Sequence, residues 1–207
     1  WRVDYLLEQA RALGMYYMMC LDTHQDFRTE GWAANPYNAS RGGPCATPAE
    51  WFTNEQAKAW YRKRLRYIVA RWGYSAHVLC WEFGNEIQGW EGAATDDQLA
   101  WHAEMSAYLA DLDPWRHLIT TSFWGGRGDE RFWALPHMDI VQTHHYGGAE
   151  AGFAGIAIEH ARAQWQRWEK PHLFAEFGVS ARGQFHDPEG WALHNCLWAG
   201  VHSGCAG

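Results

Sequence analysis

The sequence predicts an α/β fold of parallel strands closed into a TIM (β/α)8 barrel. Strand-like and helical patterns alternate along the chain, an order that implies parallel strands joined by right-handed crossovers. A doubly wound nucleotide-binding sheet is disfavoured because the chain contains no GxGxxG or GxxxxGK. A barrel instead gathers its active site from several strand ends. The residues at or just beyond the carboxyl ends of the strand-like runs here are Asp22, His24, Asn85, Glu86, Trp124, His144, Tyr146 and Glu176.

The first half of the chain is predicted to contain two helices and two strands. The predicted elements are, in order, a helix over residues 3–13, a strand over 15–22, a long surface loop over 25–52, a helix over 53–72 and a strand over 77–83. Apolar residues at helical spacing define both helices, and Gly14 is placed to end the first. Thr53 with Gln56 resembles a capping box for the second. The loop contains NPYNASRGGP, whose turn residues favour irregular structure.

The second half continues the alternation. Its predicted elements are a helix over residues 95–112, strands over 117–123 and 138–146, a helix over 155–168, a strand over 172–177 and a last helix over 187–202. Thr95 with Gln98 repeats the capping signal at the first of these helices. Asp187 and Pro188 have the chemistry of an N-cap and a first helical residue, so they are predicted to begin the last helix.

Composition favours a neutral ligand. The 207 residues carry a net charge of -7, which argues against nucleic acid and anionic membranes as partners, since either would demand a basic face. Fifteen tryptophans exceed what a core requires, and their flat apolar faces suit the C–H faces of sugars. Five cysteines form no readable disulfide pattern, and Cys20 and Cys80 are predicted to be buried thiols.

Glu86 and Glu176 lie at the carboxyl ends of two different strand-like runs. A pair of carboxyls from different strands of one barrel is the minimum equipment for cleaving a glycosidic bond. At these strand ends the chain resembles the retaining glycoside hydrolases of clan A, most closely glycoside hydrolase family 5. WEFGNE resembles that family's fourth-strand signature, FAEFG its seventh-strand nucleophile motif and the His-x-Tyr of THHY its sixth strand. The DTH of CLDTH resembles the third-strand end less specifically.

The resemblance implies hydrolysis by double displacement with retention of configuration. Glu86 is expected to be the acid/base and Glu176 the nucleophile, with the two carboxyls about 5 to 5.5 Å apart. The resemblance also assigns Asn85 to the sugar 2-hydroxyl and Tyr146 to orienting Glu176. Strand parity places His144 on the same face as Tyr146. The expected activity is endo cleavage of a β-linked polysaccharide, a β-1,4-glucan or a mannan, without cofactor or metal.

Three further residues are candidates for substrate binding: His24, Trp90 and Trp124, each beyond a strand end. His145 points opposite to its neighbour on the strand and is expected to support the barrel wall. Glu82 is expected to be a buried structural residue.

The visible strands correspond to the third to seventh of the family's barrel. Residues 1–207 are therefore expected to be a partial catalytic domain, with strands one, two and eight outside the chain. Five strands without closure leave unpaired edges, so these residues expressed alone are expected to be weakly folded or to aggregate. The first residue is Trp1, and nothing in the sequence resembles a signal peptide. A secreted or periplasmic location is expected rather than a cytoplasmic one.

Two other functions stay open at the level of sequence. Asp22, His24, His144 and His145 could form a metal site in which zinc activates water, as in other TIM-barrel hydrolases. A non-catalytic glycan-binding protein could use the aromatic cleft of a barrel, and it would need neither carboxyl. Hydrolysis is preferred because the metal site leaves WEFGNE unexplained.

Overall fold

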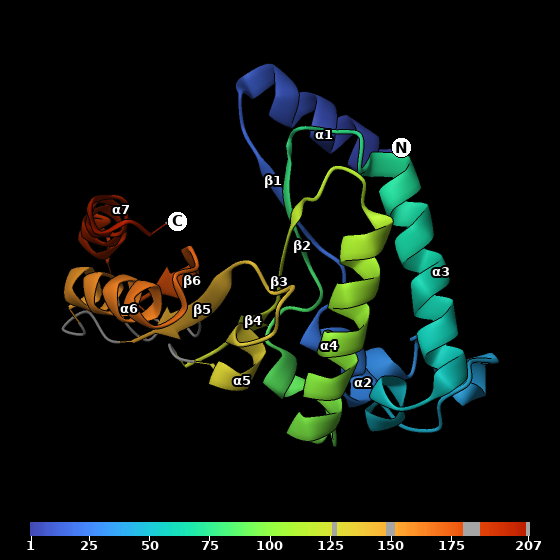
Figure 1. Cartoon of the computed structure of the whole chain (residues 1–207). Coiled ribbons are helices and arrows are strands. Elements are labelled where there is room, and N and C mark those ends of the chain that lie inside the picture. Colours follow the sequence, from blue (N-terminus) through green and yellow to red (C-terminus); the bar gives the residue numbers. More distant parts are fainter. Residues whose placement is uncertain (126–127, 148–151, 180–186, 206–207) are drawn as a thin grey trace. The chain divides into compact units, whose positions relative to one another are not determined.

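The computed structural model describes residues 1–125, 128–147, 152–179 and 187–205, and these form two compact units (Figure 1). Unit 1 comprises Trp1–Thr121 with Leu135–Met138, and unit 2 comprises Ser122–Ala134 with Asp139–Gly207. Each unit contains its own three-stranded parallel sheet. The predicted strand over residues 117–123 is interrupted at Thr121, where one unit gives way to the other.

Unit 1 alternates helices and strands as the sequence predicts. Its main elements are α1 (Arg2–Leu13), β1 (Tyr17–Cys20), α2 (Thr29–Trp32), α3 (Glu55–Trp72), β2 (Val78–Glu82), α4 (Thr95–Leu112) and β3 (Leu118–Thr120). Four 3-10 turns lie between them, at His24–Phe27, Ala39–Arg41, Ala49–Phe52 and Ile87–Gly89. The strand order is β1-β2-β3, and α3 and α4 run side by side (Figure 1).

Two expectations about helix starts are wrong. Asn54, not Thr53, caps α3, because its side-chain oxygen accepts hydrogen bonds from the backbone N–H groups of Gln56 and Ala57. At α4, Thr95 is already the first helical residue and no side chain caps the helix. Asparagine is among the best N-cap residues, so its place next to Thr53 decides the first case.

The prediction for Cys20 is also wrong. Cys80 on the central strand β2 is fully buried, as expected, but Cys20 on β1 is exposed. β1 is the outer strand of its sheet, with β2 on one side only, and this accounts for the difference.

The long segment over residues 25–52 is not a simple surface loop, because several of its aromatic side chains belong to the core of unit 1. Trp51 is fully buried, and its ring contacts those of Phe27, Tyr61 and Trp101 at centroid distances of 5.0, 5.1 and 4.6 Å. Tyr61 lies on α3 and Trp101 on α4, so the loop supplies the central side chain that both helices pack against. The polar turn residues of this segment predicted a surface loop, and they gave no sign that its aromatic residues are buried in the core.

Unit 2 contains the remaining elements. These are β4 (Ser122–Phe123), α5 (Glu130–Trp133), β5 (Val141–Tyr146), α6 (Phe153–Trp168), β6 (His172–Gly178) and α7 (Trp191–Ser203). The strand order is β4-β5-β6, and α6 packs against α7 and β6. The predicted start of the last helix at Asp187 and Pro188 is wrong, because α7 begins at Trp191 with Gly190 as its N-cap. Asp187 instead accepts hydrogen bonds from the N–H groups of Trp191 and Ala192 from outside the helix.

A bulge in β6 fixes which side chains share a face of this sheet. Thr143 on β5 pairs with Phe174, but the next residue, His144, pairs with Glu176, so Ala175 is an extra residue in β6. Phe174 and Phe177 therefore lie on the same side, stacked at 5.5 Å and packed with the core of unit 2. Without the extra residue, Glu176 would share the buried face of Phe174.

Replacing Trp51 with alanine tests the role of the segment over residues 25–52. Loss of a fully buried tryptophan is expected to lower the free energy of unfolding by about 3–5 kcal/mol. Trp115→Ala is the matched control, because Trp115 is 53% exposed in the same unit and its loss should change stability by no more than about 0.5 kcal/mol. Denaturant titration measures both, and equal losses would show that the segment does not anchor the core.

Candidate active site

In unit 1 the pairing of β1 with β2 continues past the ends of both strands. The N–H of Asn85 donates to the carbonyl of Asp22 at 2.9 Å, and the N–H of His24 donates to the carbonyl of Asn85 at 3.2 Å. Thr23 and Asn85 form a parallel bridge between these two bonds. The segment after β1 is thereby fixed beside the segment after β2, and two of the predicted strand-end groups meet.

His24 contacts both Asn85 and Glu86 through its side chain. Its Nδ1 lies 3.2 Å from Oδ1 of Asn85 and 3.5 Å from Oε2 of Glu86, while its Nε2 lies 2.9 Å from Nε2 of Gln25. The Gln25 amide is a donor, so Nε2 of His24 accepts and Nδ1 carries the hydrogen. A buried imidazole N–H is thus directed at the amide and carboxyl oxygens of the predicted catalytic pair.

Glu86 has a left-handed backbone, with φ 50° and ψ 57°. This region is unfavourable for residues with a side chain, and such strain persists where the surrounding structure imposes it, often at functional sites. The carbonyl of Glu86 accepts the N–H of Gly89, and its side chain is 15% exposed. Sequence alone gave no signal for this conformation.

A buried histidine that the sequence analysis did not identify supports the same segment. Nδ1 of His102 lies 2.7 Å from the carbonyl of Gln98, and its Nε2 lies 3.3 Å from Oγ1 of Thr121. The Thr121 hydroxyl in turn donates to the carbonyl of Gly84 at 3.0 Å. Burial lowers the pKa of His102 to about 4. His102 therefore stays neutral at physiological pH, with its single N–H directed at the Gln98 carbonyl. Its Nε2 contacts the Thr121 hydroxyl, which supports the segment two residues before Glu86 by donating to Gly84.

Asp22 forms an ion pair with Arg64 of α3. Nη1 of Arg64 donates to both carboxylate oxygens of Asp22, at 2.7 and 3.0 Å, and Nη2 donates to the carbonyl of Leu21. Burial raises the pKa of Asp22 to about 6, although the positive charge of Arg64 opposes that shift. The arginine thus joins α3 to the end of β1.

In unit 2, Tyr146, His144 and Glu176 lie together on one face of the sheet. The Tyr146 hydroxyl donates to Oε2 of Glu176 at 2.7 Å, and Nδ1 of His144 lies 3.6 Å from Oε1. His144 is buried, whereas the Glu176 side chain is 40% exposed. His145 points to the other face, where its ring contacts Phe174. This is the supporting position expected for His145.

The two candidate stacking tryptophans have different environments. Trp124 follows β4 and is half-exposed, so part of its ring is open to a ligand. Trp90 is buried, and Phe27 stacks on its face at 3.9 Å with an interplanar angle of 2°. In this structure Trp90 packs the core of unit 1 and offers no face to a sugar, which corrects its assignment as a binding residue. The sequence showed its place after a strand but not the partner ring.

The residues of the alternative metal site do not converge within either unit. The carboxylate of Asp22 is held by Arg64, and His144 and His145 lie on opposite faces of β5. Instead, each unit presents one glutamate with its own partners. Glu86 lies with His24 and Asn85 in unit 1, and Glu176 lies with His144 and Tyr146 in unit 2.

Comparison with known proteins decides the family. The model of the family described as "Cellulase (glycosyl hydrolase family 5)" matches residues 1–197. The chain belongs to glycosyl hydrolase family 5. This confirms the resemblance seen in WEFGNE, THHY and FAEFG.

Among curated members of the family, the mannan endo-1,4-beta-mannosidases F of Aspergillus fumigatus and Aspergillus clavatus are similar to this chain. They are 30% and 28% identical to it over 200 and 199 residues, which is 86% of this chain in each case. The chain spans 44% of the length of each relative.

A solved structure of the same fold is the endo-beta-1,4-mannanase from Thermotoga petrophila. It has a TM-score of 0.63 and 19% identity, and the match covers 86% of this chain and 45% of that one. The predicted fold class is confirmed: the parallel α/β units of this family 5 chain are part of a TIM barrel.

The strained backbone of Glu86 leads to a prediction about stability. Glycine tolerates a positive φ, so Glu86→Gly is expected to be more stable than Glu86→Ala by about 1 kcal/mol. The control pair, Lys63→Gly and Lys63→Ala, lies on the exposed face of α3, where the order should reverse by a similar amount. Urea unfolding measures all four variants. A less stable Glu86→Gly would show that the left-handed conformation is not imposed on the chain.

The low pKa of His102 predicts acid sensitivity. The pKa of His102 in the folded chain is about 4, below the ordinary value of 6.5. Between pH 6.5 and pH 4 the unfolded chain therefore binds a proton at this histidine that the folded chain does not bind. Stability from this group is complete above pH 6.5 and is lost as the pH falls to 4, by about 3 kcal/mol. His102→Gln should flatten the pH dependence of the unfolding free energy between pH 4 and 7 by that amount. Parallel profiles for the two proteins would contradict the prediction.

Proposed function

We propose that this chain carries the two catalytic carboxyls of a retaining endo-β-glycanase, with β-1,4-mannan as the preferred substrate. The observation that carries the proposal is that each unit presents a glutamate at a strand end with its own set of polar partners. Family membership supports the reaction class, and the mannosidase relatives support mannan over glucan.

The proposed reaction has two steps that share the same two groups. Glu86 gives a proton to the leaving glycosidic oxygen while Glu176 attacks the anomeric carbon, which forms a glycosyl–enzyme ester. Glu86 then removes a proton from water, and the water displaces Glu176 with a second inversion. Retention requires the two carboxyls to lie about 5 to 5.5 Å apart in the active protein.

The neighbours of the two glutamates fit these separate roles. The Tyr146 hydroxyl holds one oxygen of Glu176 and so fixes the plane of the attacking carboxylate. Asn85 has its Oδ1 engaged by His24, which orients the Asn85 amide beside Glu86. We assign that amide to the sugar 2-hydroxyl, where a hydrogen bond strengthens as the oxocarbenium ion forms. Half-exposed Trp124 is the assigned stacking residue.

The test of this function is hydrolysis of soluble β-mannan and β-1,4-glucan by the protein and its glutamine variants. Glu86→Gln should lower kcat/KM on mannan by roughly 10² to 10⁴ and Glu176→Gln by at least as much. The matched controls are Glu8→Gln in unit 1 and Glu159→Gln in unit 2, both exposed glutamates whose loss should leave the rate unchanged. A rapid fall in viscosity identifies endo cleavage.

The product distinguishes the roles of the two glutamates. With azide present, a Glu176→Ala variant should form an α-glycosyl azide, because the anion takes the place of the missing nucleophile. A Glu86→Ala variant should form the β-anomer, because the covalent intermediate still forms there. Undiminished hydrolysis in Glu176→Gln would overturn the mechanism, and a preference for glucan would overturn the substrate.

A further inference from the structure

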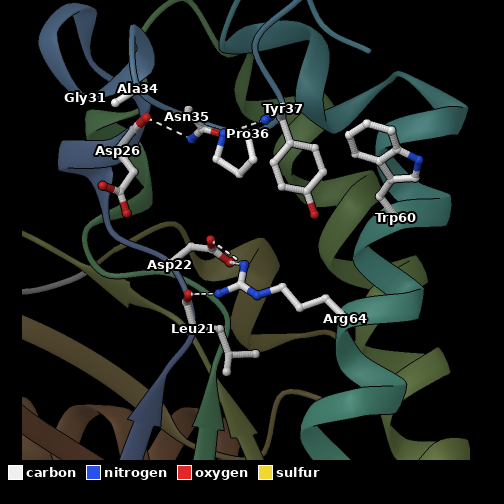
Figure 2. Close-up of a pocket in the computed structure, with 10 residues that line it drawn as sticks. All are labelled: Leu21, Asp22, Asp26, Gly31, Ala34, Asn35, Pro36, Tyr37, Trp60 and Arg64. Carbon is white, nitrogen blue, oxygen red and sulfur yellow. Dashed lines mark hydrogen bonds and ion pairs between the residues drawn. The ribbon is translucent and has the colours of Figure 1, made fainter. Parts of the chain in front are cut away.

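Unit 1 contains a second feature suited to sugars, a pocket of about 420 Å³ beside the Asp22–Arg64 ion pair (Figure 2). It is bounded by the end of β1, by the face of α3 and by the segment that follows β1 along the chain. Its lining residues are Leu21, Asp22, Asp26, Gly31, Ala34, Asn35, Pro36, Tyr37, Trp60 and Arg64. We propose that this pocket, whose lining contains neither Glu86 nor Glu176, binds one neutral pyranose unit.

The polar side of the pocket has nearly balanced charge. Arg64 neutralises Asp22, whose side chain is only 9% exposed. The Arg64 side chain is 37% exposed, and a guanidinium has more N–H groups than the bonds to Asp22 and Leu21 require. Asp26 contributes a carboxylate on another side (Figure 2). An anion would meet these two carboxylates, and a cation would meet the guanidinium. A neutral ligand with several hydroxyls can bond to both kinds of group.

The other side of the pocket is aromatic and apolar. Trp60 and Tyr37 lie next to each other, with ring centroids 6.0 Å apart, and Pro36 lies beside Tyr37 on its other side (Figure 2). Trp60 is 39% exposed although it is a large apolar side chain on a helix, so part of its ring is available. The Tyr37 hydroxyl points toward the ion pair (Figure 2). A pyranose has an apolar C–H face and a hydroxyl rim, which matches this pairing of ring and polar group.

The wall that carries Tyr37 is preformed. Asn35 donates from Nδ2 to the carbonyl of Asp26 at 3.0 Å and accepts at Oδ1 from the N–H of Tyr37 at 2.9 Å, which fixes Pro36 between them. Gly31 also lines the pocket, where a Cβ would lie 2.0 Å from the carbonyl oxygen of Gln25. The close approach of these two backbone segments therefore needs glycine. A preformed wall lowers the entropy cost of binding.

The test measures binding rather than hydrolysis, so its outcome does not depend on the proposed activity. The protein used is the Glu86→Gln/Glu176→Gln double variant, and the probes are D-mannose and β-1,4-mannobiose, titrated with detection by calorimetry and by ligand-observed NMR. Trp60→Ala should weaken one binding event about tenfold, and Tyr37→Phe should weaken the same event. Trp115→Ala, which removes another exposed tryptophan of unit 1, should leave it unchanged.

A crystal of the double variant soaked in mannobiose gives the second readout, with the sugar expected between Trp60 and the Asp22–Arg64 pair. Thermal unfolding shows whether each variant is folded, and Tyr37→Phe keeps the buried ring if Trp60→Ala proves unstable. Sugar binding that is insensitive to both substitutions would overturn the proposal, as would the absence of any binding that depends on Trp60. If the unsubstituted protein hydrolyses neither mannan nor glucan while the double variant shows Trp60-dependent binding, this proposal stands and only the proposed enzyme is contradicted.

Discussion

The end of β1 depends on one guanidinium. Arg64 of α3 donates to the carbonyl of Leu21 and to both carboxylate oxygens of Asp22, while the carbonyl of Asp22 accepts the N–H of Asn85 from the segment after β2. The side chain of Asp22 therefore lines the pocket, while its backbone carbonyl binds the segment that carries Glu86. Because the same residue, Asp22, makes both sets of bonds, the proposed sugar pocket and the proposed acid/base share one support.

The aromatic content of the chain serves packing as well as recognition. Phe27 and Trp51 come from the long segment after β1, and Trp90 stacks on Phe27 from the turn after β2. The segments after β1 and β2 are thus held together by ring packing as well as by backbone hydrogen bonds. These stacked rings pack beside the segment that carries Asn85 and Glu86, and the Thr121 hydroxyl supports Gly84 by donating to its carbonyl.

Much of the fold and part of the site followed from sequence. The periodic elements were predictable because helix and strand bury their apolar residues at different spacing, and the functional strand ends because barrels collect polar groups there. Three features were not. The extra residue at Ala175 leaves the strand-like composition of the run unchanged, so the bulge has no sequence signal. Glutamate rarely adopts the left-handed backbone that Glu86 has. The burial of Trp90 depends on the ring of Phe27, 63 positions away. All three are set by tertiary contacts, which local patterns do not report.

The two carboxyls differ in ways that suit two roles. Glu86 sits on a strained backbone, is 15% exposed and faces an imidazole N–H. Glu176 follows a bulge, is 40% exposed and accepts a phenol hydroxyl. A proton donor that must also act as a base needs a defined position near the leaving oxygen, while a nucleophile needs an open line to the anomeric carbon. Each unit has a local distortion at its glutamate: Glu86 has a left-handed backbone, and the residue inserted before Glu176 moves that side chain to the other face of the sheet. Both distortions therefore lie where the proposed chemistry needs a side chain in a position that an ideal strand would not give it.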